Sequence, residues 1–264
     1  MVEAPRYESI QIVGSGNIAY HLAQRLASRE LYQSIRIVSR NESMRETFQH
    51  LSNKIDFNSN ENFNFDIPAT IIAVSDDAIA TVAAQYVNYN HLILHTAGSV
   101  DTDILHKIGF QNFGSLYPLQ TFSMRKAVDW NKIPVFISAN SEENSKKTSI
   151  IAQNLSEKIH YIDDRQRLAL HIAAVIANNF SNHLFAEAEH WLDNHSLKFD
   201  FILPLIQETI EKLQYLSPFD AQTGPAIRND QKVIDKHIKE LSTQPDLSDL
   251  YQLLSLSIQK IHNK

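Results

Sequence analysis

Two glycines, Gly14 and Gly16, open the segment of this sequence best suited to bind a phosphate group. The 264 residues contain only six glycines, whereas an average protein has about 7 %. Gly14 allows a tight turn, Gly16 lets a pyrophosphate approach the backbone, and the small Ala19 lets a helix pack on the preceding strand. Free N–H groups at the start of that helix can bind phosphates. The pattern G-x-G-x-x-A therefore predicts a dinucleotide site formed by Gly14, Ser15, Gly16, Asn17, Ile18 and Ala19. The alternative is an ordinary turn between a strand and a helix.

The residues after the second apolar run, 35–38, favour one dinucleotide over the other. NAD sites place a carboxylate here to bind the ribose hydroxyls. This sequence has Ser39 and Arg40, and its first carboxylate is Glu42. Because a guanidinium and a hydroxyl suit a 2′-phosphate, we expect NADP(H) rather than NAD(H), with Ser39 and Arg40 among its ligands. The alternative is that Arg40 is a solvated loop charge.

Polar residues also follow two later apolar runs, 69–74 and 91–94. In open α/β sheets, ligands bind beyond the carboxyl ends of parallel strands, so both segments should border the crevice. The cofactor-binding candidates in these two segments are Val74, which ends the first run, and the polar residues Ser75, Asp76 and Thr96. Near the expected nicotinamide end, His95 and Ser99 are candidates for binding a substrate.

The elements that must position these residues can be predicted from hydrophobic spacing. In the first 164 residues, helical patterns alternate with five short apolar runs: 9–13, 35–38, 69–74, 91–94 and 134–138. Ser43 and Glu46 fit a capping box before the second helix. Such alternation is typical of parallel βαβ units, so we expect a Rossmann-like, doubly wound α/β sheet, mostly parallel.

The second part of the chain has a different pattern. After residue 164 the apolar residues recur at helical spacing, and no convincing strand follows Tyr161. We therefore expect two domains, a nucleotide-binding domain over 1–164 and an all-α C-terminal domain over 165–264.

Six segments together carry a resemblance to a known family: VGSGNIAYHLA, HTAGSV, LYPLQTFS, PVFIS, HIAAVIANNFSNHL and GPAIRND. The chain resembles the Rossmann-like NADP oxidoreductases with a helical C-terminal domain of unknown function, over nearly its whole length. More distantly, it is similar to pyrroline-5-carboxylate reductase and the 6-phosphogluconate dehydrogenase superfamily. The resemblance implies NADP binding by the first domain, dimerisation through the helical domain and a substrate pocket between the two. It does not supply a substrate.

Hydride transfer to a C=O or C=N bond requires a group that protonates the developing anion. The related β-hydroxyacid dehydrogenases and ketopantoate reductases use a lysine and an asparagine on the first helix after the nucleotide domain. The corresponding helix here, 167–192, contains no lysine. It offers His171 and Asn178, about 10 Å apart on one face, and Asn179, about 80° around the helix from His171. His171, as proton donor, and Asn179 are the catalytic candidates; the alternative is that His171 is a buried histidine that packs the helix.

Three further residues are candidates for binding a substrate. Tyr117 precedes a proline, which keeps it extended, and Gln120 follows with an amide that could face the cleft. Arg228 comes just after the turn Gly224-Pro225 and could bind a carboxylate in a bidentate manner. The alternatives are packing for Tyr117 and a salt bridge for Arg228.

Composition and spacing argue against several other classes. The net charge of −6 disfavours nucleic-acid binding, and the absence of cysteine removes disulfides and thiolate chemistry. The pair His91 and His95, roughly 13 Å apart on a strand, is too widely spaced to share a metal ion, so no metal is expected. We also expect no membrane segment and no signal peptide, and therefore a cytoplasmic protein.

Two functions remain. The first is an NADP(H)-dependent oxidoreductase that transfers a hydride to or from a small carbonyl or imine substrate bound between the domains. The second is a catalytically silent NADP(H)-binding sensor or dimeric partner. Apolar stretches such as FDFILPLI in the helical domain favour a homodimer in either case.

Overall fold

The computed structural model describes residues 7–59, 67–87 and 90–262 of the chain. The chain divides into two compact units, Met1–Ile176 and Ala177–Lys264, named unit 1 and unit 2 here. Unit 1 holds the sheet and unit 2 is helical where it is described. The division predicted after residue 164 falls at the start of a long helix, whereas the boundary between the units falls inside it.

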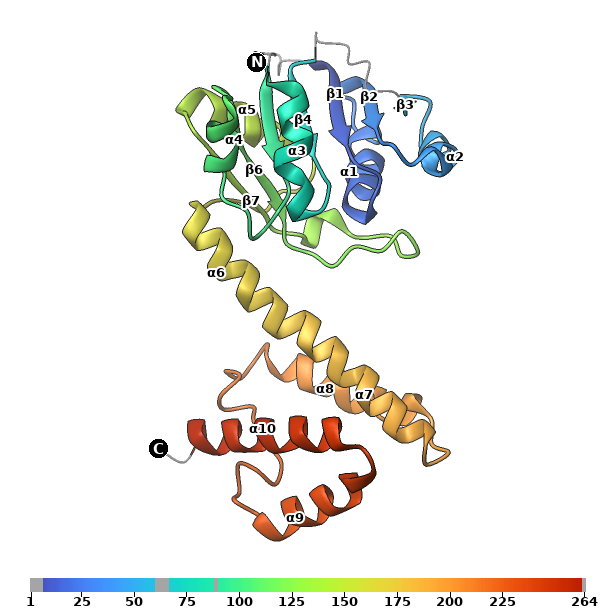
Figure 1. Cartoon of the computed structure of the whole chain (residues 1–264), viewed down its shortest axis with the longest axis vertical. Helices are drawn as coiled ribbons and strands as arrows, with labels where there is room; N and C mark the ends of the chain where they lie inside the picture. The colour runs from blue at the N-terminus through green and yellow to red at the C-terminus, as the bar shows by residue number, and fades with distance from the viewer. Residues whose placement is uncertain (1–6, 60–66, 88–89, 263–264) are drawn as a thin grey trace. The chain divides into compact units, whose positions relative to one another are not determined.

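Unit 1 is built on one twisted sheet, which has eight strands in the described part of the chain (Figure 1). Its strands are β1 (Tyr7–Val13), β2 (Tyr32–Val38), β3 (Ile55–Asn58), β4 (Ala69–Ile72), β5 (Leu92–His95), β6 (Phe113–Pro118), β7 (Val135–Ala139) and β8 (Ile159–Tyr161). They are ordered β3-β2-β1-β4-β5-β6-β7-β8, and every neighbouring pair is parallel except β6 and β7. The predicted fold class, a doubly wound and mostly parallel α/β sheet followed by a helical region, is confirmed.

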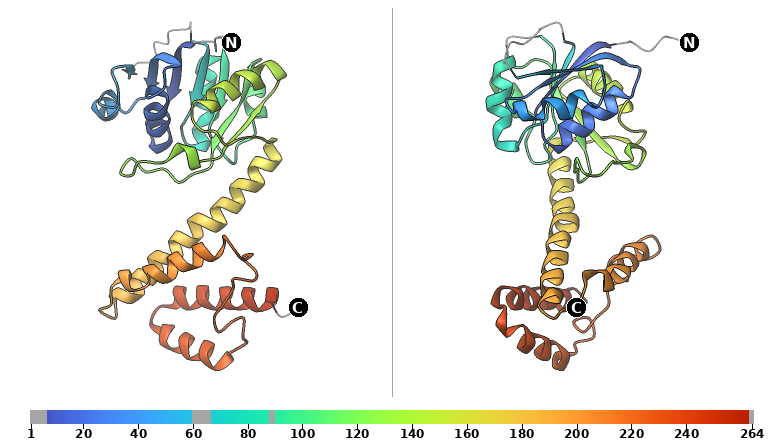
Figure 2. Two further views of the ribbon diagram at one scale, coloured as in Figure 1. Left: turned by 180° about the vertical axis from the view of Figure 1, so that it is seen from behind. Right: turned by 90° about the vertical axis from the view of Figure 1, so that its right-hand side faces the viewer.

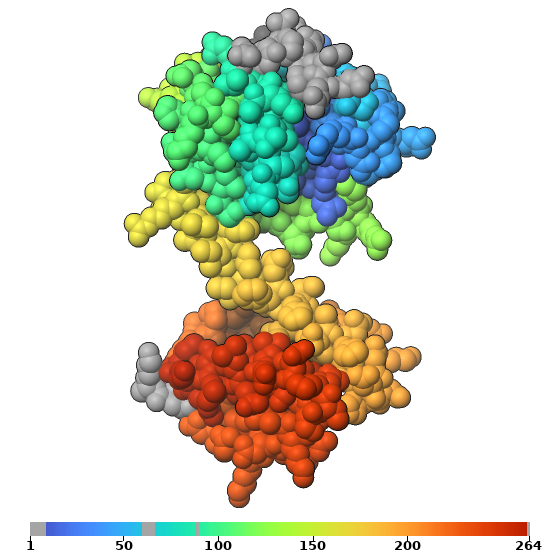
Figure 3. All heavy atoms as spheres, viewed as in Figure 1, coloured from blue at the N-terminus to red at the C-terminus, as the bar shows by residue number. Residues whose placement is uncertain are grey.

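Helices cover both faces of this sheet, which is why β4 and β5 are buried at every position. One face packs on α1 (Asn17–Ala27), α2 (Arg45–Gln49) and α5 (Glu142–Gln153). The other face packs on α3 (Ile79–Ala83) and α4 (Asp103–Ile108). These two helices face the viewer in Figure 3, whereas α1 and α5 are seen in the left view of Figure 2, which is turned by 180°. Because side chains alternate along a strand, Ile71 joins the first core and Ile72 the second.

Five of the strands match the predicted apolar runs, and three strands, β3, β6 and β8, were not predicted. The sequence of β6 gives little strand signal, because Gly114, Ser115 and Pro118 interrupt its apolar residues. The capping box predicted for Ser43 and Glu46 is wrong. Ser43 lies in a 3₁₀ turn, η1 (Glu42–Met44), where its hydroxyl donates to Asn41, so α2 begins at Arg45 without a side-chain cap.

A capping box does occur at the start of α6 (Asp164–Ala174). Asp163 Oδ1 accepts the N–H of Gln166 at 2.7 Å, and Gln166 Oε1 accepts the N–H of Asp163 at 3.0 Å. From α6 the helix continues through a π-helical stretch, η5 (Val175–Phe180), into α7 (Ser181–Asp193). Two reciprocal hydrogen bonds therefore fix the N-terminal end of α6.

Unit 2 contains α7, α8 (Leu203–Lys212), α9 (Gln231–Glu240) and α10 (Pro245–His262). Among its described residues, the buried hydrophobic side chains are only Ala226, Ile234 and Leu241. No helix in the described ranges of the chain is both long and apolar enough to cross a membrane.

Candidate functional site

Gly14 is required by the protein's own backbone. Its φ is +127°, a value that side-chain-bearing residues rarely adopt. A Cβ at this position would lie 2.2 Å from the carbonyl oxygen of Ala73 at the end of β4. The N–H of Gly14 donates to the carbonyl of Val38 at 2.9 Å, at the end of β2. The tight turn therefore brings the ends of β1, β2 and β4 together.

Gly16 has a different role, because nothing in the protein requires a glycine there. It is the N-cap of α1 with an extended backbone, and a Cβ added to it would meet no heavy atom of the described structure within 4 Å. Gly16 therefore leaves open space over the first turn of α1, where N–H groups lack intrahelical acceptors. This is the arrangement that accepts a phosphate group, and behind it Ala19 is fully buried, as predicted for helix–strand packing.

Asn17, the first residue of α1, carries a contact to a loop that the sequence did not predict. Its Oδ1 accepts the N–H of Met124 at 3.2 Å, and one turn later His21 Nε2 lies 2.9 Å from the carbonyl oxygen of Ser123. The segment after β6 therefore crosses the N-terminal turn of α1.

A cleft of about 640 Å³ opens beside the glycine turn. Most of the predicted cofactor residues line it: Gly14, Ser15, Gly16, Ile18, Ser39, Arg40, Val74 and Ser75. It is also lined by residues that the sequence did not single out, namely Val13, Val38, Asn41, Ser59, Ala73, Ala78, Thr81, Val82, Gln85 and Tyr86. None of these residues belongs to a recognised sequence motif, so their place in the cleft could not be predicted from the sequence.

The rim of this cleft at the end of β2 is polar and cationic. Ser39 Oγ donates to Ser15 Oγ at 2.7 Å and accepts the N–H of Asn41 at 3.2 Å. Arg40 is exposed, and among the described residues its guanidinium has no hydrogen-bond or ion-pair partner. The nearby carboxylate of Glu42 binds Arg45, which lowers the pKa of Glu42. Arg40, the one cation among the described residues that line the cleft, is thus available to an anion.

A second group of predicted residues meets at the carboxyl end of β6, within unit 1. The hydroxyl of Tyr117 and Nδ1 of His171 share a hydrogen bond of 3.0 Å, and their rings are edge to face. Gly98 packs against the same imidazole, since a Cβ there would lie 2.5 Å from His171 Nδ1. Burial raises the pKa of Tyr117. The cation of Arg167 opposes this rise, and the negative charge of Asp76 adds to it. Tyr117 is therefore protonated at neutral pH.

Asp76 and Ser99 are also brought together, because the Ser99 hydroxyl donates to Asp76 Oδ2. Thr96 and His95 lie deeper. The Thr96 hydroxyl donates to the carbonyl of Ile72, and His95 is fully buried, with Nδ1 accepting the N–H of Ala97 at 3.3 Å. Burial, with a smaller contribution from Arg167, lowers the pKa of His95 to about 3. His95 is thus a neutral residue of the interior, and its binding of a substrate stays a prediction.

The remaining candidates are placed individually. Gln120 uses its amide oxygen to accept the N–H of Thr121. Asn178 and Asn179 are exposed side chains of η5, and Arg228 lies after the turn at Gly224. Asn179 and Arg228 belong to unit 2, and their roles stay predictions. No group of three or more histidine, aspartate or glutamate side chains suited to a metal ion occurs among the residues that the structure describes.

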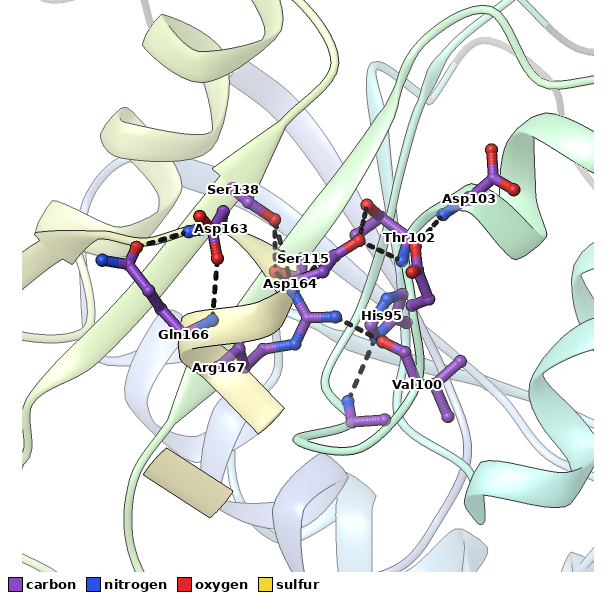
Figure 4. Close-up of polar contacts among 12 residues, drawn as sticks. His95, Val100, Thr102, Asp103, Ser115, Ser138, Asp163, Asp164, Gln166 and Arg167 are labelled. Atoms are coloured by element: carbon purple, nitrogen blue, oxygen red, sulfur yellow. Dashed lines mark hydrogen bonds and ion pairs between the residues drawn. The ribbon is translucent and has the colours of Figure 1, made fainter. Parts of the chain in front are cut away.

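Arg167 is the main residue of this region that the sequence did not single out. It is 1 % exposed, and its guanidinium donates to Ser115, Ser138, Asp164 and the carbonyl of Val100 (Figure 4). In sequence it is one of two arginines at the start of a long helix, while its partners come from three other segments. Only the folded sheet reveals the site.

Comparison with known proteins identifies the family. A family model described as a domain of unknown function, DUF2520, matches residues 133–258. The chain is 35 % identical to a solved structure from Bacteroides fragilis titled "putative NADP oxidoreductase", with a TM-score of 0.90, covering 97 % of this chain and 100 % of that one. No curated protein matches the sequence.

More distant solved structures share the fold. A Streptomyces aurantiacus imine reductase has 11 % identity and a TM-score of 0.66, covering 96 % of both chains. A Plasmodium falciparum pyrroline carboxylate reductase, solved with NADP bound, has 13 % identity and a TM-score of 0.57, covering 98 % of this chain and 99 % of that one. With the glycine turn, the polar cleft and the close relationship to the Bacteroides protein all in place, the chain belongs to the family of Rossmann-like NADP oxidoreductases with a C-terminal domain of unknown function.

Proposed function

We propose that this protein is an NADP(H)-dependent oxidoreductase that transfers a hydride to or from a small carbonyl or imine. The observation that carries the proposal is the cleft beside α1, where Gly16 leaves open space over N–H donors and Arg40 has an unused cation at the rim. Its family is named for NADP, and two structural neighbours are named as reductases of an imine and of a pyrroline carboxylate.

The residues present fit a dinucleotide phosphate. The backbone at Ser15, Gly16 and Asn17 would hold the pyrophosphate at the N-terminus of α1. Ser39 and Arg40, with Asn41 beside them on the cleft wall, would bind the 2′-phosphate. Among the described residues that line the cleft there is no carboxylate to repel this group, and the nearby Glu42 is paired with Arg45.

The pair Tyr117–His171 supplies the proton that the reaction needs. Bound NADPH would supply a hydride, two electrons with one hydrogen, and leave as NADP⁺. The oxygen of a carbonyl or the nitrogen of an imine must gain one proton at the same time. His171 is partly exposed and hydrogen-bonded to Tyr117, which stays protonated at neutral pH because burial raises its pKa. His171, protonated on both ring nitrogens, would donate the Nε2 proton to the substrate and be left as a neutral imidazole that water reprotonates, while Tyr117 would orient its ring through Nδ1.

The first test is calorimetric titration with NADPH and, separately, with NADH. We expect NADPH to bind at least tenfold more tightly, about 1.4 kcal/mol, because only NADPH carries the phosphate that Arg40 can bind. Arg40→Ala should remove this preference and leave NADH binding within about twofold. The matched control is Arg165→Ala, which removes an exposed arginine of α6 and should change neither affinity.

Three other outcomes each correct a part of the proposal. Tighter binding of NADH would overturn the cofactor assignment. Failure of both to bind would reduce the glycine pair to a tight turn and overturn the oxidoreductase proposal. Tight NADPH binding with no turnover of any carbonyl or imine in a broad screen would favour the second hypothesis, a silent NADP(H)-binding protein.

We also propose that unit 2 pairs with a second copy of the chain. Large apolar side chains are exposed on its helices and on the turns between them: Leu197, Phe201, Leu203, Leu205, Ile210, Leu213, Tyr215, Leu216, Phe219, Leu253, Leu254, Leu256 and Ile261. Exposed apolar surface of this extent marks an interaction site in a protein. A second copy is the occupant that brings an equal apolar surface of its own, because two-fold pairs use the same patch on both subunits.

A further inference from the structure

Arg167 is a buried cation whose contacts join three segments of unit 1. Its Nη1 donates to Ser115 Oγ on β6 at 2.9 Å and to Ser138 Oγ on β7 at 3.4 Å. Its Nη2 donates to the carbonyl of Val100, in the loop after β5. Among the residues that the structure describes, the one carboxylate in contact with it is Asp164, one turn earlier on α6. Burying a guanidinium is costly unless it is paired, so a protein keeps one where the position matters.

Asp164 extends the same connection. Its Oδ2 accepts the N–H of Thr102 at 2.8 Å and the hydroxyl of Thr102 at 2.7 Å (Figure 4). The loop after β5 is therefore held at two points, Val100 by Arg167 and Thr102 by Asp164. Between β5 and these two points lies Gly98, the residue whose backbone packs on the imidazole of His171.

The contacts of Arg167 and His171 follow a matching periodicity. Arg167 and His171 are four residues apart on α6, so they lie on one face with a rise of about 6 Å between them. Ser115 and Tyr117 are two residues apart on β6, so they lie on one face with a rise of about 6.6 Å. Arg167 contacts Ser115, and His171 contacts Tyr117. The two contacts are successive steps along the first two turns of α6 and along β6.

We propose that Arg167 is a positioning residue, which sets the register of α6 on β6 and so holds Nδ1 of His171 on the hydroxyl of Tyr117. The proposal rests on the proposed function only in that the Tyr117–His171 pair transfers the proton. Without the contacts of Arg167, α6 can shift or rotate by a fraction of a turn, and His171 moves off both Tyr117 and Gly98. The cation also lies close enough to Tyr117 to oppose the rise in its pKa.

The test measures His171 directly and does not require a substrate. In protein labelled with ¹⁵N and ¹³C at histidine, the imidazole of His171 is assigned by its loss in His171→Gln. In the unsubstituted protein we expect one dominant tautomer, because Nδ1 is engaged by Tyr117. Tyr117→Phe provides the reference signal of His171 without this hydrogen bond. Arg167→Met should give the Tyr117→Phe signal, whereas the control Arg165→Met, an exposed arginine two residues earlier, should not change it.

Arg167→Met leaves Asp164 without its cation and could fail to fold, so Ser115→Ala is the second variant. It removes one contact and leaves the Asp164–Arg167 pair intact. We expect the His171 signal to move in the same direction as in Tyr117→Phe, by a smaller amount. An unchanged His171 signal in folded Arg167→Met, or in Ser115→Ala if Arg167→Met does not fold, overturns the proposal.

Calorimetry separates this proposal from the proposed function. Arg167 is not among the residues that line the dinucleotide cleft, so folded Arg167→Met, or Ser115→Ala in its place, should bind NADPH within twofold of the unsubstituted protein. If the unsubstituted protein binds no NADPH, the proposed function fails and the His171 result still stands. A loss of NADPH binding in the folded variant would instead assign it a role in the cleft and overturn the positioning role.

Discussion

The sheet of unit 1 and the helices of unit 2 differ in how they use apolar side chains. In unit 1, two clusters of buried residues lie on opposite faces of the sheet, and residues at the centre such as Leu94 have no exposed surface. In unit 2, three hydrophobic residues are buried in the described part, and Leu205 on α8 is 66 % exposed. Unit 1 therefore buries a core of its own, whereas unit 2 leaves much of its apolar surface exposed in the single chain.

The largest expected effect comes from opening the core of unit 1. Leu94→Ala removes a buried side chain between two layers and should lower the free energy of unfolding by about 3 kcal/mol. Leu205→Ala is the matched change in unit 2 and should cost less than about 0.5 kcal/mol when the protein is dilute enough to be a single copy. Urea denaturation of both variants measures this difference. Equal losses at low concentration would mean that the apolar surface of unit 2 is covered within one chain.

A second effect concerns a polar side chain inside unit 1. The pKa of His95 falls from 6.5 in the unfolded chain to about 3 in the fold, so the unfolded state binds the extra proton as the pH falls. The stabilisation that follows from keeping His95 neutral is fully present above pH 6.5 and is lost progressively as the pH falls toward 3. Between pH 6.5 and 4.5 we expect a loss of about 2 kcal/mol in the free energy of unfolding.

His95→Asn is the control for this prediction. The Oδ1 of the asparagine can replace Nδ1 of His95 as the acceptor of the Ala97 N–H, and it does not titrate. Burial also lowers the pKa of His91 to about 4, so some dependence on pH should remain in the variant. Asp164 does not contribute in this window, since its pKa is lowered to about 2 and its stabilisation is lost only below pH 3.8. A variant as sensitive to pH as the unsubstituted protein would show that His95 is not the titrating group.

The smallest expected effect is on association. Leu205→Asp places a charge on the exposed apolar surface of α8 and should weaken pairing of two copies at least tenfold, about 1.4 kcal/mol. Sedimentation equilibrium at micromolar concentration measures it, and Gln207→Asp, which adds the same single charge at an exposed polar position of the same helix, is the control. A single-copy mass for the unsubstituted protein would remove the proposed dimer.

The fold is predictable from the sequence where the signal is local. The glycine pair, the short apolar runs and the helical spacing after residue 164 predicted the fold class, because each depends on residues close together in the chain. β6 was missed since Gly114, Ser115 and Pro118 make it resemble a loop. Pairing with β7 stabilises it, and that contact is not visible in its own six residues.

The candidate site was predicted in pieces. His171 and Tyr117 are each candidates for separate reasons, and their hydrogen bond depends on where the first turns of α6 meet β6, which no spacing in the sequence specifies. Gly98 and Arg167 were missed for the same reason. A glycine within HTAGSV and an arginine in a helix become informative only when their neighbours in space are known.

The contacts of Arg167 also have a consequence for the order in which unit 1 folds. Arg167 lies 52 residues after Ser115 and 67 residues after Val100 in the chain. At about 5–20 residues per second during synthesis, Ser115 emerges roughly 3 to 10 s before the arginine to which it bonds. Until then the polar ends of β5 and β6 lack their protein partner. During synthesis these contacts therefore form only after Arg167 has emerged, with strands made several seconds earlier.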